Sequence, residues 1–72
     1  MVYFTEQEKQ IIELLELGFN NRKIAETLAI SVHTVKIHIT NIYRKLEVNN
    51  RVSAVVKIYK LKQEGVEFKH DA

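Results

Sequence analysis

The chain has 72 residues and a formal net charge of +2, with 46% hydrophobic and 28% charged residues, no cysteine, no proline and two glycines. This size predicts one small domain, and the lack of cysteine excludes disulfides and thiolate metal sites. The sequence has no apolar run approaching about 18 residues and no basic-then-apolar leader. We therefore expect neither a membrane span nor export, and a cytoplasmic location.

Positive and negative charges are distributed unevenly along the chain, although the net charge is small. Residues 1–21 carry −3, residues 22–62 carry nine Lys and Arg against two Glu for +7, and residues 63–72 carry −2. A basic middle between acidic ends is typical of a protein that binds a polyanion. Chance clustering of solvated lysines is the alternative explanation.

The first predicted helix covers about residues 6–17. Thr5 and Glu8 have the spacing of a capping box, in which each side chain accepts a hydrogen bond from the other residue's backbone N–H. Phe4 precedes this cap and is expected to staple the first turns. Gly18 is the expected left-handed residue after the helix end.

A second helix over about residues 21–28 and a third over residues 32–46 follow. Asn20 and Ser31 are of the residue types that cap helix N-termini. Only two residues separate the end of the second helix from Ser31. Two helices joined by so short a turn predict a helix-turn-helix.

The third predicted helix has two faces of different character. At 100° per residue, its apolar stripe for packing on a core consists of Val35, Ile39, Ile42 and Leu46. The opposite face carries His33, Ile37, Thr40 and Arg44, with Lys36 and Asn41 at its margins. This face has cations and hydrogen-bonding groups but no acid, which suits the edge of a base pair beside a phosphate.

The last predicted helix covers about residues 51–63 and is capped by Asn50. Its expected inner stripe consists of Ala54, Val55, Ile58 and Leu61. A second apolar strip lies away from that stripe and indicates a surface covered by a partner: Val52, Val56 and Tyr59. We expect residues 1–72 to form one all-α, four-helix bundle-like domain, with an ordered core over about 4–63 and a frayed tail over 64–72.

No catalytic or metal site can be assembled from the sequence. His33 and His38 would lie about 140° apart on a helix, and no third ligand accompanies them. Neither a Ser/His/Asp arrangement, nor paired carboxylates, nor a glycine-rich phosphate loop is present. We therefore expect no enzymatic activity, no cofactor, no metal and no small-molecule substrate.

Several spaced motifs run in order through most of the chain: Phe4-Thr5-x-x-Glu8, Leu14-Leu15-x-x-Gly18, Asn21-x-x-Ile24-Ala25-x-x-Leu28, Ile30-Ser31-x-x-Thr34-Val35-Lys36-x-His38, Asn41-Ile42-x-x-Lys45-Leu46-x-Val48 and Arg51-x-x-Ala54-Val55. In these motifs the chain resembles the LuxR/NarL-type helix-turn-helix DNA-binding domain of bacterial transcription regulators. The stretch N-I-Y-R-K-L is also similar to MalT-like activators.

The resemblance implies that the third helix is a recognition helix lying in the major groove of DNA. Lys36, Ile37 and Thr40 match the positions that read bases: a donor to guanine or a phosphate, a contact for a thymine methyl, and an adaptable hydroxyl. His33 and Arg44 are further candidates for base edges or the backbone. Ile37 has the alternative of an ordinary exposed apolar residue.

The resemblance also implies phosphate contacts by Thr34, Lys45, Asn20 and Asn21. The two asparagines lie at a helix N-terminus, where the helix dipole favours an anion. Lys45 has the alternative of covering the core with its aliphatic stem. Asn41 is either a phosphate contact or a structural hydrogen bond.

For the last helix, the resemblance implies dimerisation through Val52, Val56 and Tyr59, giving a weak homodimer that reads two half-sites about one turn of DNA apart. The strip has the alternatives of packing on the tail or on a regulatory domain. Arg51 is interpreted as a structural anchor rather than a DNA contact. The alternative function is a protein-interaction module that docks RNA polymerase or a sigma factor, for which an apolar or acidic recognition face is expected.

Overall fold

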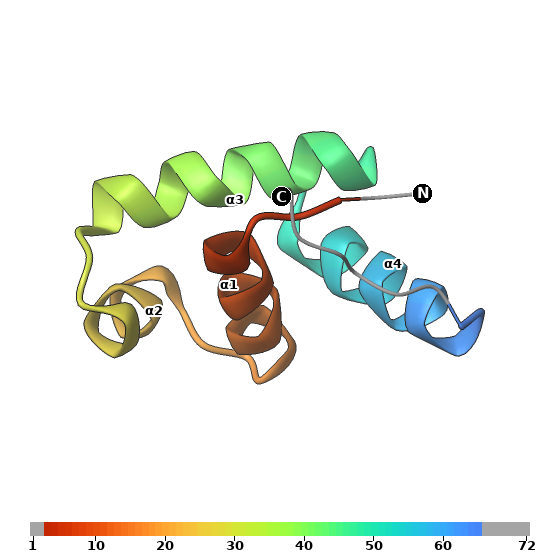
Figure 1. The fold of residues 1–72 in the computed structure, drawn as a ribbon, viewed down its shortest axis with the longest axis horizontal. Helices are drawn as coiled ribbons and strands as arrows, with labels where there is room; N and C mark the ends of the chain where they lie inside the picture. The colour runs from red at the N-terminus through yellow and green to blue at the C-terminus, as the bar shows by residue number, and fades with distance from the viewer. Residues whose placement is uncertain (1–2, 66–72) are drawn as a thin grey trace.

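The structure, a computed structural model, describes residues 3–65 and contains four helices in that part of the chain. They are α1 (Glu6–Glu16), α2 (Asn21–Leu28), α3 (Val32–Leu46) and α4 (Arg51–Gln63). Helix α3 lies across the other three, with α1 between α2 and α4 (Figure 1). The predicted all-α, four-helix fold is confirmed, whereas residues 66–72 of the predicted tail lie outside the described residues.

The helices begin where their capping residues predict. The side chains of the four N-caps, Thr5, Asn20, Ser31 and Asn50, each accept a hydrogen bond from the N3 backbone N–H. The capping box of α1 is complete, because Glu8 Oε1 also accepts from Thr5 N at 2.9 Å. Local hydrogen bonding thus fixes the helix starts before any packing is considered.

The helix ends depend on residues in the left-handed region. Gly18 has a φ of +83°, as predicted, and α1 ends at Glu16 with Leu17 as its C-cap rather than its last residue. Ala29 and Glu47 also take positive φ values, of 57° and 59°, after α2 and α3. A left-handed alanine makes the turn between α2 and α3 tight, so that Ser31 caps α3 two residues later.

One hydrophobic core joins all four helices. Its buried members are Phe4, Ile11, Ile12, Leu15, Ile24, Ala25, Val35, Ile39, Ile42, Leu46, Ala54 and Ile58. The predicted apolar stripe of α3 is entirely buried, and Val55 and Leu61 of α4 pack against the core while only partly buried. This packing fixes the rotation of α3 about its axis and thereby determines which of its residues face solvent.

Within residues 3–65, no helix is both long enough and apolar enough to span a bilayer.

Candidate nucleic-acid interface

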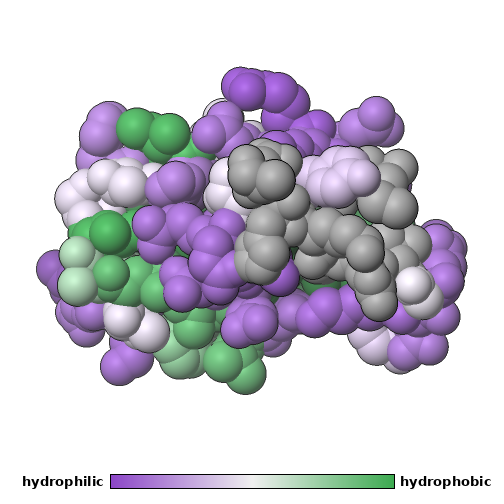
Figure 2. All heavy atoms as spheres, in the orientation of Figure 1, coloured by the Kyte–Doolittle hydropathy of each residue, from purple (hydrophilic) through white to green (hydrophobic). Residues whose placement is uncertain are grey.

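The outer face of α3 carries all five residues predicted to read bases. His33, Lys36, Ile37, Thr40 and Arg44 are exposed. Figure 2 shows the ridge formed by α3 as largely hydrophilic, with a hydrophobic patch over its N-terminal half. Because the opposite stripe of this 15-residue helix is buried in the core, one continuous face without acidic residues is exposed to solvent.

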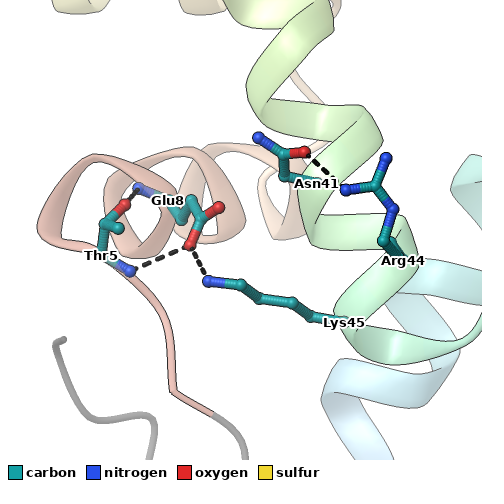
Figure 3. A network of polar contacts seen from close by, with 5 residues as sticks. All are labelled: Thr5, Glu8, Asn41, Arg44 and Lys45. Carbon is teal, nitrogen blue, oxygen red and sulfur yellow. Dashed lines mark hydrogen bonds and ion pairs between the residues drawn. The ribbon is translucent and has the colours of Figure 1, made fainter.

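Hydrogen bonds within α3 leave specific groups of this face available. The Thr40 hydroxyl donates to the Lys36 carbonyl oxygen at 2.9 Å, so its oxygen remains able to accept from a base. Arg44 Nη1 donates to Asn41 Oδ1 at 3.2 Å, and this bond holds the guanidinium along the helix (Figure 3). Asn41 thus makes one of the two contacts considered for it, the structural hydrogen bond.

Thr34 and Ser31 form a small hydroxyl pair at the start of α3. Ser31 Oγ donates to Thr34 Oγ1 at 2.9 Å and accepts from Thr34 N at 3.0 Å. The Thr34 hydroxyl therefore keeps its own proton for an outside acceptor such as a phosphate oxygen.

Lys45 reaches from α3 to the first turn of α1, where it meets a buried carboxylate (Figure 3). Its Nζ lies 2.7 Å from Glu8 Oε1 and 5.4 Å from the centroid of the Phe4 ring. The Glu8 side chain is 4% exposed and that of Lys45 is 32% exposed. The ammonium group of Lys45 thus pairs with a buried carboxylate beside the Phe4 ring, while 32% of the Lys45 side chain is still exposed to solvent.

This environment changes the acidity of Glu8. Burial raises the pKa of its carboxyl, but hydrogen bonds from Lys45 and Thr5 and the positive charge of Lys45 outweigh burial, so the net pKa lies below the ordinary value of 4.5. Sequence reasoning identified Glu8 as a capping residue and missed its pairing with Lys45. The available signal was the position of Lys45 on the wheel, close to the apolar stripe.

The N-terminus of α2 presents the second group of predicted phosphate contacts. Asn20 is exposed and uses its Oδ1 to cap the helix at Lys23 N, 2.9 Å away, while Asn21 is half-buried. The first turn of α2 contains no acid. Arg51, on α4, donates hydrogen bonds to the Phe19 carbonyl oxygen and to Asn21 Oδ1 in this region, which agrees with the structural role inferred for it.

No group of three or more His, Cys, Asp or Glu side chains in residues 3–65 is arranged to hold a metal ion. His33 is exposed and His38 is half-buried on α3.

A short-turn helix pair whose second helix faces solvent with an acid-free, cationic side defines a helix-turn-helix DNA-binding domain. Residues 2–58 match the family described as bacterial regulatory proteins, luxR family, and the chain belongs to that family. It is thus a DNA-binding domain of the kind found in transcription regulators, as the resemblance predicts.

Curated relatives are similar over most of this chain. The transcriptional regulatory protein DegU of Brevibacillus brevis is 45% identical over 56 residues, which are 78% of this chain and 24% of DegU. The nitrate/nitrite response regulator protein NarP of Escherichia coli is 43% identical over 63 residues, which are 88% of this chain and 28% of NarP. The chain therefore spans about a quarter of the length of these relatives.

Solved structures share the fold. The response regulator ChrA of a heme-sensing two-component system superimposes with a TM-score of 0.79 at 39% identity, over 82% of this chain and 29% of that one. The transcription factor GerE gives a TM-score of 0.74 at 33% identity, over 83% of this chain and 90% of that one.

Proposed function

We propose that the domain binds double-stranded DNA in a sequence-specific way, with α3 in the major groove, as one half of a symmetric dimer on a dyad-related site. The observation that carries the proposal is the outer face of α3, which is cationic, free of acids and held in place by a wholly buried apolar stripe. Because the proposed ligand is the bacterial chromosome, we also propose that the protein acts in the cytoplasm.

Two sets of residues have different roles in this proposal. Lys36, Ile37 and Thr40 read bases, helped by His33 and Arg44 at the two ends of the face. The backbone contacts come from Asn20, Asn21, Thr34, Asn41 and Lys45. Ile37 is 49% exposed and suits a thymine methyl, because an apolar contact there would remove that surface from water.

The test compares three lysine variants on a panel of duplexes selected from random sequence. Lys36→Ala should reduce sequence preference: at the base pair that Lys36 reads, the difference in binding free energy between the preferred base and the others should shrink by about 1–3 kcal/mol. At a temperature where denaturation shows the variant to be folded, since Lys45 also pairs with buried Glu8, Lys45→Ala should weaken binding to all sequences alike. Lys60→Ala, an exposed lysine of α4 without a proposed DNA contact, is the control for loss of one charge.

Affinity should also fall steeply with salt, since phosphate contacts release counterions. Identical behaviour of Lys36→Ala and Lys45→Ala would show that the two roles are wrongly assigned. Affinity independent of salt would contradict phosphate-driven binding altogether.

The dimer rests on an apolar strip of α4 that faces away from the core. Val52, Val56 and Tyr59 are 74%, 53% and 62% exposed. A small domain with such a strip is expected to cover it with a second copy. In sedimentation experiments at rising concentration, the mass of the wild type should increase, and that of Val56→Lys should stay monomeric. A wild type that is monomeric at millimolar concentration and indistinguishable from Val56→Lys would remove this part of the proposal.

A further inference from the structure

Arg51, the first residue of α4, makes two hydrogen bonds to segments that lie about thirty residues earlier in the chain. Its Nη1 donates to the Phe19 carbonyl oxygen at 2.8 Å, and its Nη2 donates to Asn21 Oδ1 at 2.7 Å. Phe19 belongs to the α1–α2 connection, and Asn21 is the first residue of α2. One half-buried guanidinium therefore joins the start of α4 to the start of α2.

The contact also fixes which end of the Asn21 amide faces outward. A guanidinium has donors only, so Asn21 must turn its oxygen toward Arg51 and its NH₂ group away from it. Among residues 3–65 this NH₂ group has no hydrogen-bond partner, and no side-chain nitrogen or oxygen is buried without one. The two N–H donors of Asn21 therefore reach solvent beside an acid-free first turn of α2.

We infer that Arg51 is a positioning residue for DNA binding: it holds the Asn21 amide with both donors outward, toward a phosphodiester oxygen at the start of α2. The inference rests on the phosphate role of Asn21 in the proposed function. Arg51 acts through Asn21 and does not touch DNA itself, since its two described hydrogen bonds point into the protein. The same contact ties the α2 N-terminus to the helix that carries the proposed dimer strip.

Two other roles for Arg51 give different results in a salt titration. If Arg51 contacted phosphate directly, removing it would make the salt dependence of binding shallower by about one counterion. If Arg51 were only structural, its loss would lower stability without changing the affinity of the folded protein. In the positioning role, affinity falls while the salt dependence is unchanged, because Asn21 is neutral.

The experiment uses the full chain and a short mixed-sequence duplex at a temperature where thermal denaturation shows every variant to be folded. We compare the wild type with Arg51→Gln, Asn21→Ala and the double variant. Lys62→Gln is the matched control, because Lys62 also links α4 to an earlier helix, through Glu16 at 2.7 Å, and its loss removes the same charge. Arg51→Lys provides a second variant that keeps the charge but loses the two-pronged contact.

Relative to Lys62→Gln, Arg51→Gln should weaken binding by about three- to tenfold, the range expected for one hydrogen bond, with an unchanged salt dependence. Asn21→Ala should show a similar loss, the double variant no further loss, and Arg51→Lys an intermediate one. A shallower salt dependence, an unchanged affinity, or a loss that persists in the Asn21→Ala background overturns the inference but leaves the proposed function intact. If Asn21→Ala binds as the wild type does, the phosphate role of Asn21 itself is wrong.

Discussion

Replacing Lys45 with methionine should destabilise the domain by about 2 kcal/mol. The substitution keeps an apolar stem beside Phe4 but leaves the Glu8 carboxylate, 4% exposed, without the ammonium group 2.7 Å away. Breaking a fully buried ion pair costs about 3–5 kcal/mol, and an exposed pair contributes about 0–1 kcal/mol. Since Lys45 is 32% exposed, the expected cost lies between these limits. For a domain of this size it corresponds to a fall in Tm of roughly 8–16 °C.

Thermal and urea denaturation followed by circular dichroism measure this effect. Lys62→Met is the matched control, because the Lys62–Glu16 pair has the same 2.7 Å distance but side chains that are 48% and 27% exposed, so its loss should cost less than about 1 kcal/mol. Adding Glu8→Gln to Lys45→Met should recover much of the loss by removing the unpaired charge. Equal effects of the two lysine substitutions, or no recovery in the double variant, would refute the role given to burial.

Three further predictions concern stability. Because the pKa of Glu8 is lowered in the folded state, its carboxylate contributes fully to the free energy of unfolding above the ordinary pKa of 4.5, and this contribution is lost as the pH falls through the folded-state pKa. In acid titration, Glu8→Gln should therefore lose less stability than the wild type. Ile42→Ala, at a fully buried position of α3, should cost about 2–5 kcal/mol in urea denaturation. Ala29→Gly should raise Tm and add about 0.5–1 kcal/mol to the free energy of unfolding, because glycine adopts a positive φ without strain. Gly18→Ala should lower Tm because of its positive φ alone, since a Cβ at this position would meet no atom within 4 Å.

The parts of the fold that depend on local interactions could be predicted from the sequence. Each N-cap is decided by a side chain and an amide three residues apart, so Thr5, Asn20, Ser31 and Asn50 identify the helix starts directly. The outer face of α3 follows from a 3.6-residue period and from the burial of the opposite stripe. The end of α1 was predicted one residue too late because Leu17, apolar but 69% exposed, reads as a continuation of the helix.

The contacts between distant segments could not be predicted. Glu8 and Lys45 are 37 residues apart, and Arg51 lies 30 residues from Asn21. Which side chains meet across helices depends on the angle and axial offset at which the helices pack, and these are set by the shapes of many core residues together. A wheel shows that Lys45 lies near the core side of α3, but it does not show which helix lies there.

The separation of core and outer face on α3 has a consequence for how such a domain can change during evolution. Exposed positions such as Lys36, Ile37 and Thr40 contribute little to folding, and substitutions there usually alter stability by less than about 0.5 kcal/mol. If these residues read bases as proposed, a lineage can exchange them one at a time and acquire new target sequences without passing through variants that unfold. Lys45 lacks this freedom, because the side chain that we propose to contact a phosphate also pairs with a buried carboxylate.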